Sequence, residues 1–186
     1  MSNIPKRNEL ATEAAGTTIS MSLELIVIPV ADVERAKRFY ASLGWRLDFD
    51  FDSGDDYRVI QFTPAGSTCS VMFGRNITAA APGSAHGLYL IVSDLAAARD
   101  ELLLRGIEID EPIHDTGGVF HHADGKGVVS GANPQRQSYA SYASFRDPDG
   151  NGWLLQEVTA RLSAEVKLGD ARFTRQLLQA IGAKAA

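Results

Sequence analysis

The sequence has little cysteine and no long apolar run. Its single cysteine, Cys69, excludes an intramolecular disulfide. Because Cys69 lies in an apolar strand pattern, we expect a buried, unreactive thiol rather than a nucleophile. No stretch approaches the roughly 20 apolar residues that a membrane span needs, and the N-terminal residues lack the apolar centre of a signal peptide. These features predict a cytoplasmic protein with no membrane partner.

Basic charge is also scarce. The chain has 18 Lys and Arg residues against 23 Asp and Glu, which gives a formal net charge of -5. No run of basic residues alternates with aromatic residues, so we expect no nucleic acid partner. The sequence also lacks a Gly-x-Ser-x-Gly elbow, which argues against serine hydrolase chemistry. With 45% hydrophobic residues the chain can bury a sizeable core, and small organic molecules are its expected partners.

One short stretch, Asp147-Pro148-Asp149-Gly150, organises the rest of the chain. It combines a side-chain acceptor, a fixed φ angle and a glycine in the order that a tight turn requires, so it predicts a hairpin between two strands. A weaker copy lies upstream, where Pro64 and Gly66 precede Pro148 and Gly150 by 84 residues. Two such hairpins predict two modules of similar structure.

The first module is predicted to have the order βαβββ. An apolar run over residues 23–30 indicates a strand, and Asp32 then caps a helix that ends at Gly44. Three further strand patterns cover residues 46–51, 57–63 and 69–74.

The second module repeats the first. Asp94 and Gly106 follow Asp32 and Gly44 by 62 residues, whereas the closing hairpins are 84 residues apart. The second module therefore holds 22 extra residues. We assign them to the glycine-rich segment 112–138, a long loop that we expect to be a mobile cover over a site.

The predicted fold class is α+β, and the chain divides into consecutive parts. These are a disordered leader (1–20), a first module (21–74), a linker (75–84), a second module (85–159) and a C-terminal amphipathic helix (160–186). The helix places Phe173, Leu177 and Ile181 on one apolar face. This face and the apolar sheet face of each module both need cover, which predicts a homodimer.

The tandem βαβββ pattern, the Val-x-Asp sequence before each helix and the stretch Asp147-Pro148-Asp149-Gly150-Asn151 resemble the vicinal oxygen chelate (VOC) superfamily. That superfamily includes glyoxalase I, extradiol dioxygenases and the fosfomycin and bleomycin resistance proteins. The resemblance implies two tandem modules whose curved sheets surround a cup-shaped pocket. It also implies that, in metal-dependent members, His, Glu or Gln side chains from the first and last strands of each module hold a divalent ion.

At the positions that the resemblance assigns to metal ligands, this chain has Leu25, Met72, Gly87 and Leu154, or Gln156 in place of Leu154. Leucine and glycine side chains cannot bind a metal, and a thioether suits these ions poorly. At most one oxygen ligand survives, whereas stable divalent sites usually need three or more protein ligands. We therefore expect no metal cofactor and a pocket widened by apolar or small residues.

The leading interpretation is a metal-independent member that binds a small organic molecule in the cup, either to sequester it or to catalyse a rearrangement. Histidine and buried carboxylate are the usual proton-transfer groups, and the candidates here are His114, His121, His122 and Glu157. Arg58 and Gln61 are candidates for polar ligand contacts, and strand alternation lets only one of the two face inward.

Two alternatives remain. The first is a metal-dependent lyase or dioxygenase of glyoxalase type, with a site rebuilt from Glu157, Gln156 and histidines. Against it, Glu157 has the wrong strand parity unless a bulge intervenes, and His86 points to the other face unless the start of its strand is irregular. The second alternative is an interaction protein whose shallow cup is filled by its own side chains.

Overall fold

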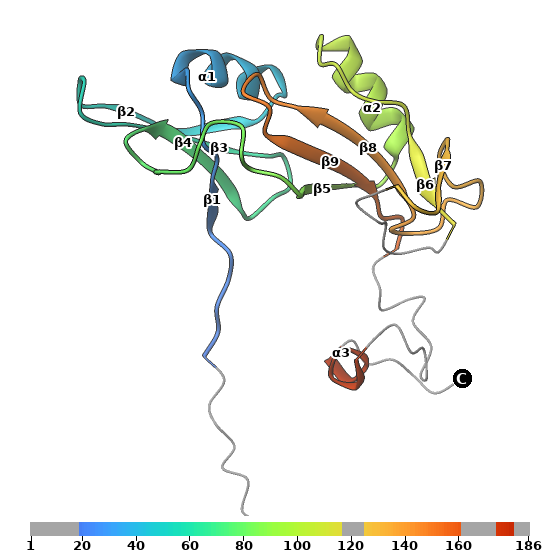
Figure 1. Cartoon of the computed structure of the whole chain (residues 1–186). Coiled ribbons are helices and arrows are strands. Elements are labelled where there is room, and N and C mark those ends of the chain that lie inside the picture. The colour runs from blue at the N-terminus through green and yellow to red at the C-terminus, as the bar shows by residue number, and fades with distance from the viewer. Residues whose placement is uncertain (1–18, 117–124, 161–173, 181–186) are drawn as a thin grey trace, which may run out of the picture.

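The computed structural model describes residues 19–116, 125–160 and 174–180. The elements, labelled in Figure 1, are β1 (Leu25–Val27), α1 (Val33–Ser42), β2 (Arg46–Asp52), β3 (Arg58–Thr63), β4 (Ser70–Arg75), β5 (Leu88–Val92), α2 (Leu95–Leu104), β6 (Ile113–Asp115), β7 (Val128–Ser130), β8 (Ser141–Arg146), β9 (Gly152–Glu157) and α3 (Arg175–Ala180).

The elements form two mixed sheets, one for each module. The first sheet has the order β1-β4-β3-β2 and the second has the order β5-β9-β8-β6-β7. In each sheet the first strand of the module pairs in parallel with the last strand, and the other pairs are antiparallel. The predicted α+β class and the two tandem modules are confirmed; the second module has one strand more than the first, in the order βαββββ.

α1 and α2 each begin after a capping aspartate and end near a glycine. The carboxylates of Asp32 and Asp94 accept hydrogen bonds from the backbone N–H groups of Arg35 (2.9 Å) and Ala97 (3.0 Å), which satisfies donors in the first turn of each helix. After each helix, Gly44 or Gly106 takes a left-handed conformation, with φ of 78° and 79°. Both predicted caps and both predicted glycine stops are therefore present.

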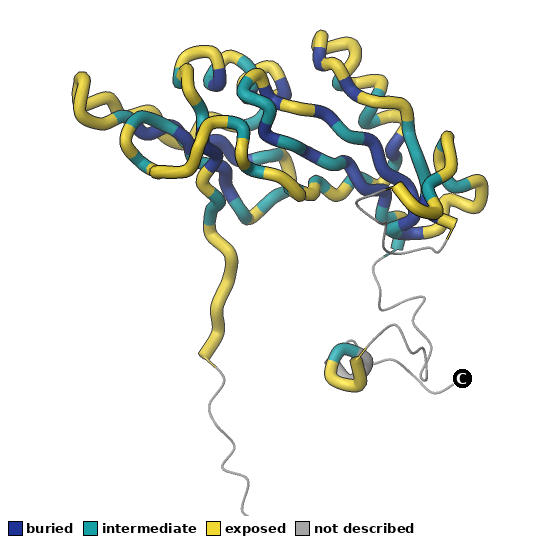
Figure 2. Tube along the Cα trace, in the orientation of Figure 1, coloured by how far each residue is buried: buried dark blue, intermediate teal, exposed yellow. Residues whose placement is uncertain are grey.

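The two helices lie on the same side of the two sheets, so they share one core (Figure 1). Tyr40 of α1 is completely buried at its centre, with its ring 5.4 Å from that of Trp45 and 6.2 Å from that of Trp153. Residues of β8 and β9 that face the helices, such as Phe145 and Leu155, belong to the same cluster. Figure 2 shows this buried band running through the strands beneath the helices. We call the opposite face of both sheets, turned away from α1 and α2, the open face.

The Asp147–Asn151 turn joins the modules. The Tyr40 hydroxyl donates a hydrogen bond to Asp147 Oδ2 (2.8 Å), and Asn151 Nδ2 donates to the carbonyl oxygen of Pro29 (2.9 Å). Asn151 also accepts from the N–H of Ala85 (3.0 Å). Since Tyr40 and Pro29 belong to the first module, the turn that closes the second module also fixes its place against the first.

The structure corrects the expected long loop at 112–138. This segment contains β6 and β7, which pair with each other and extend the second sheet beyond β8. Its central part lies outside the described residues, and so do His121 and His122. Cys69 is also partly exposed rather than buried.

The C-terminal helix is described only over the six residues of α3, so Phe173 and Ile181 lie outside the described residues. Residues 1–18 of the expected leader lie outside them as well. None of the helices in the described ranges has the length and apolar content of a bilayer span.

Candidate functional site

The open face of the first module is lined by aromatic and aliphatic side chains. Phe49 and Phe51 project from β2 with 50% and 48% of their surface exposed, and their ring centroids are 6.3 Å apart. Val27 of β1 is 40% exposed on the same face, opposite Met72 of β4. A single chain thus leaves a substantial apolar surface in contact with water.

A small polar group interrupts this apolar surface. Asp48 lies at a register irregularity in β2 and accepts hydrogen bonds from Arg46 and from the Thr63 hydroxyl. Thr63 lies within hydrogen-bonding distance of the Ser70 hydroxyl (2.7 Å). The hydrogen bond from Arg46, followed by that from Thr63, lowers the pKa of Asp48, so this carboxylate is ionised at neutral pH.

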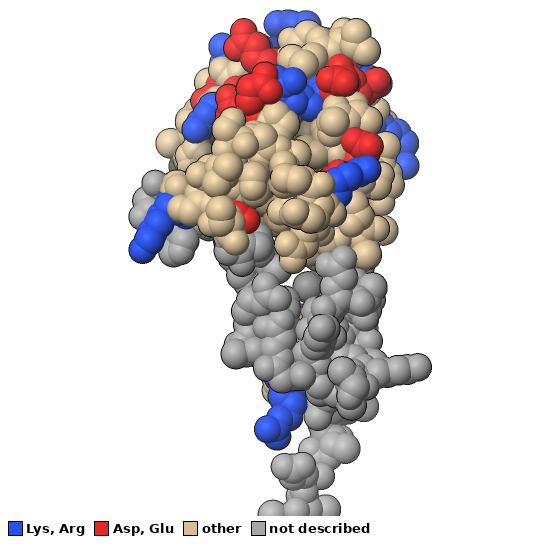
Figure 3. Space-filling model, turned by 90° about the vertical axis from the view of Figure 1, so that its right-hand side faces the viewer, with Lys and Arg blue, Asp and Glu red and all other residues tan. Residues whose placement is uncertain are grey.

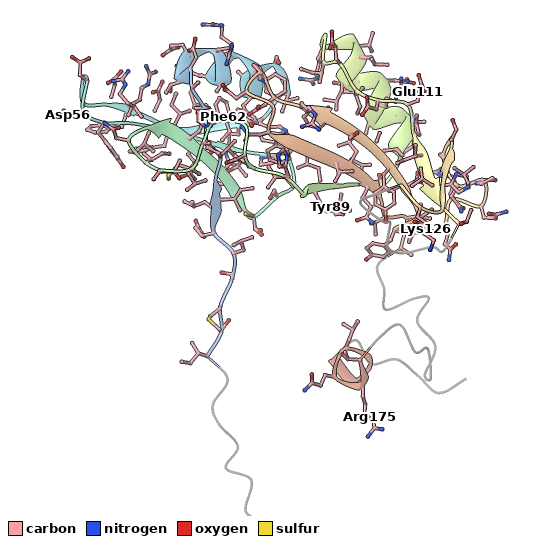
Figure 4. The ribbon with its side chains drawn as sticks, in the orientation of Figure 1. Asp56, Phe62, Tyr89, Glu111, Lys126 and Arg175 are labelled. Carbon is pink, nitrogen blue, oxygen red and sulfur yellow. The ribbon has the colours of Figure 1, made fainter. Side chains whose placement is uncertain are left out.

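The open face of the second module also combines exposed apolar side chains with a few polar groups. Tyr89 and Ile91 of β5 are 46% and 47% exposed, and Figure 4 shows Tyr89 on the side of β5 away from α2. Gln156 Nε2 donates to the Tyr142 hydroxyl (3.2 Å) and to the carbonyl oxygen of Tyr139 (3.1 Å). Burial raises the pKa of Tyr142 to about 12, so its hydroxyl stays protonated.

A groove of about 840 Å³ lies on this part of the open face. Its lining combines apolar and charged groups, and it includes His86, Tyr89, Asp110, Ser144, Arg146 and Leu154. The Ser144 hydroxyl donates to Asp110, and Arg146 Nη1 donates to the carbonyl oxygen of Gly150 (2.9 Å).

His86 is the residue that the sequence reasoning missed. Strand alternation assigned it to the other face, with an irregular strand start as the exception. That exception is present, because Gly87 has a φ of 71° and β5 begins only at Leu88. The glycine immediately before the strand pattern was the available signal.

The residues at the inherited ligand positions do not fit a divalent ion. Leu25, Gly87 and Leu154 carry no donor atom, and Met72 offers only a thioether. Within the described parts of the chain, no three His, Cys, Asp or Glu side chains come close enough together to hold a metal.

Two of the proposed proton-transfer residues lie on the helix side of the sheet. Glu157, only 3% exposed, accepts hydrogen bonds from the N–H of Leu95 (3.2 Å) and from Arg136 Nη2 (2.7 Å). His114 pairs with Ser141, on the same face as the core residue Ala143, and its Nδ1 lies 2.7 Å from the carbonyl oxygen of Gly131. Both side chains therefore have structural partners away from the open face.

Arg58 and Gln61 lie on opposite faces of β3. Arg58 forms ion pairs with Glu34 in the first turn of α1 (2.5 Å) and with Asp50 and Asp52 of β2 (3.1 and 3.2 Å). Gln61 alternates with the core residues Ile60 and Phe62 and so projects from the open face.

Charged side chains are unevenly distributed at one end of the molecule. Figure 3 views the molecule from the end where α2, β6 and β7 lie. Lys, Arg, Asp and Glu side chains gather on its upper part, towards the helices, and are fewer on the lower part of the described surface. At this end of the molecule, charged side chains are therefore more frequent near the helices than on the lower part of the described surface.

Comparison with known proteins matches residues 22–155 to a family model described as the Glyoxalase/Bleomycin resistance protein/Dioxygenase superfamily. No curated protein matches the chain.

Solved structures of similar fold align with this chain over nearly their whole length. TnmS3, an antibiotic binding protein from Streptomyces sp. CB03234, is 26% identical, with a TM-score of 0.55 over 76% of this chain and 99% of its own. A glyoxalase/bleomycin resistance protein from the same organism is 28% identical, with a TM-score of 0.51 over 73% of this chain and 100% of its own. A superfamily member from Sphaerobacter thermophilus DSM 20745 is 25% identical, with a TM-score of 0.53 over 74% of this chain and 98% of its own.

Proposed function

The chain belongs to the Glyoxalase/Bleomycin resistance protein/Dioxygenase superfamily, and we propose that it binds a small organic molecule against its open face without a divalent ion. The observation that carries this proposal is the composition of the open face. Half-exposed aromatic side chains such as Phe49 and Tyr89 surround a few polar groups, while Leu25, Met72 and Leu154 occupy positions of metal ligands. Such a mixture is typical of pockets for organic ligands.

Sequestration is the form of this function that we favour. Of the four candidates for metal-independent proton transfer, the two within the described residues, His114 and Glu157, have partners on the helix side of the second sheet. The same placement argues against Glu157 as a ligand of a rebuilt metal site. The likeness to TnmS3, described as an antibiotic binding protein, supports binding rather than turnover as the main activity.

We also propose that the cup closes only in a homodimer. In one chain the open faces of the two sheets point in the same general direction, so neither covers the other (Figure 1). A second copy would place its second module over the first module of its partner. This arrangement would bury Val27, Phe49, Phe51, Tyr89 and Ile91 and enclose the ligand.

The proposed function is tested by binding and metal content measured on one preparation. Protein purified without chelator is analysed for zinc, nickel, iron and manganese, and a panel of aromatic antibiotics is screened by calorimetry. We expect ligand binding in the micromolar range that EDTA does not change. Phe49→Ser should weaken binding at least about tenfold, since it removes an aromatic wall of the open face.

Leu104→Ser is the matched control, because Leu104 is an exposed apolar residue at the end of α2, away from the open face. It should leave the affinity unchanged. Stoichiometric metal whose removal abolishes binding would overturn the proposal.

A further inference from the structure

We propose that His86 and Arg146 form a recognition site for a carboxylate group of the ligand. This inference rests on the proposed binding function and specifies the chemical class of the ligand. It starts from the register of β8 and β9, in which Arg146 lies opposite Gly152 at the end of the hairpin. Arg146 shares the open face with Ser144 and Leu154, because these residues alternate with the core residues Phe145 and Trp153.

Gly152 is what brings the two basic side chains together. A Cβ atom at this position would lie 3.2 Å from His86 Nδ1 and 3.9 Å from Arg146 Nη1. Both side chains therefore converge over the glycine, in space that any other residue would fill. Gly87 contributes from the other side, because its positive φ turns His86 towards the groove.

The Arg146 guanidinium keeps hydrogen-bonding capacity for a ligand. It has five N–H donors, and the structure assigns one of them to the carbonyl oxygen of Gly150. Within the described residues no carboxylate forms an ion pair with Arg146, in contrast to Arg58, Arg99 and Arg136. A planar guanidinium with free donors matches the two oxygens of a carboxylate.

The other residues that line the groove indicate the chemistry of the rest of the ligand. Tyr89 and Leu154 supply an apolar surface next to the basic pair. Glu108 and Asp110 line the groove as well, and Asp110 accepts a hydrogen bond from Ser144. The groove is therefore polarised, with positive charge near Gly152 and negative charge near Asp110. This geometry fits an aromatic or alicyclic carboxylic acid whose carboxylate lies beside Gly152.

A pair of probes that differ only in charge tests this inference. 2-Naphthoate and 2-naphthamide have the same ring system, but only the first carries a carboxylate at pH 7. We expect the wild-type protein to bind 2-naphthoate about tenfold more tightly, because charge-assisted hydrogen bonds are stronger than neutral ones. Arg146→Gln should reduce this preference to about twofold or less, because it weakens binding of 2-naphthoate much more than binding of 2-naphthamide, and His86→Asn should reduce the preference partly.

Arg38→Gln is the control, since it removes the same charge from the exposed surface of α1. It should keep the full preference. Backbone amide NMR shifts of Gly87 and Gly152 should report naphthoate binding at this end of the groove. Equal affinities for the two probes, or a preference that survives in Arg146→Gln, would overturn the carboxylate site while leaving the proposed binding function intact. Failure of the wild-type protein to bind either probe or any compound of the antibiotic panel would instead count against both proposals.

Discussion

Tyr40 connects the shared core to the turn that joins the two modules. Its ring fills the centre of the shared core, and its hydroxyl donates to Asp147 in the turn that joins the modules. Tyr40→Phe removes this donor and leaves a buried carboxylate with one hydrogen bond fewer. We predict a loss of about 1–3 kcal/mol in the free energy of unfolding, measured by urea denaturation. Tyr57→Phe, at an exposed tyrosine, is the control and should change stability by less than about 0.5 kcal/mol.

The same tyrosine makes stability depend on alkaline pH. Burial, followed by the charge of Asp147, raises the pKa of Tyr40 above its ordinary value. A tyrosine in the unfolded chain loses its proton near pH 10, whereas folded Tyr40 keeps its proton at higher pH. The stabilising contribution is therefore complete below about pH 10 and decreases as the pH rises through the raised pKa. Urea midpoints between pH 8 and 11 should fall more steeply for wild type than for Tyr40→Phe, and parallel curves would contradict this assignment.

Glu157 is predicted to stabilise the fold rather than to take part in ligand chemistry. Its buried carboxylate accepts from the first turn of α2 and from Arg136, whose own backbone has a positive φ of 49°. Glu157→Gln should lower the free energy of unfolding by about 1–3 kcal/mol, because the charge-assisted bonds become neutral ones. Its affinity for 2-naphthoate, measured below the unfolding transition, should remain unchanged. A variant of full stability that no longer binds ligand would return Glu157 to a functional role.

Local chemistry determined which single-residue features could be predicted from the sequence. Asp32 and Gly44 mark the ends of α1 through hydrogen bonds and φ angles that depend only on neighbouring residues. The contact of Asp147 with Tyr40 joins residues 107 positions apart, and no pattern in the sequence marks it. His86 is an intermediate case. The sequence shows that a glycine, Gly87, follows it, but does not show that this glycine has a positive φ.

At the scale of elements, strand length separates what was predicted from what was missed. β3 and β4 have six residues each, bounded by turn residues, so their positions follow from the sequence, whereas the face of each side chain was known only once the strand register was seen. β6 and β7 have three residues each, too few to show a period, and they form because β8 offers an edge for pairing. Within the described part of segment 112–138, β6 and β7 therefore widen the second sheet.

This difference leads to a prediction for hydrogen exchange. The N–H groups of Asp115, Thr116 and Gly131 donate to backbone carbonyl oxygens, at 3.2, 3.1 and 2.8 Å. We expect their exchange to be slow in ligand-free protein, as for other amides paired in a sheet. Residues 19–23, which are exposed and belong to no strand, provide a fast-exchanging reference in the same sample. Fast exchange at all three positions would instead support a mobile cover over the cup.

At the scale of the whole molecule, the arrangement of the two open faces predicts where the cup forms. If module 1 of one chain covers module 2 of its partner, each dimer contains two cups and each cup uses residues of both chains. Light scattering should give the mass of a dimer at micromolar concentration. A chain ending at Leu162 should give the same result if the open faces, rather than the C-terminal segment, make the contact. A monomeric mass for the full chain would exclude the homodimer.

Complementation between two defective chains distinguishes a cup shared between chains from a cup within one chain. Phe49→Ser impairs the first module and Arg146→Gln impairs the second, so each homodimer has two defective cups in either arrangement. Co-expression with two different affinity tags allows heterodimers to be purified. With shared cups, one cup of each heterodimer combines both defects and the other combines none, so 2-naphthoate should bind at about half of the sites with wild-type affinity. With cups inside single chains, every cup keeps one defect, and no tight site can appear in the calorimetric titration.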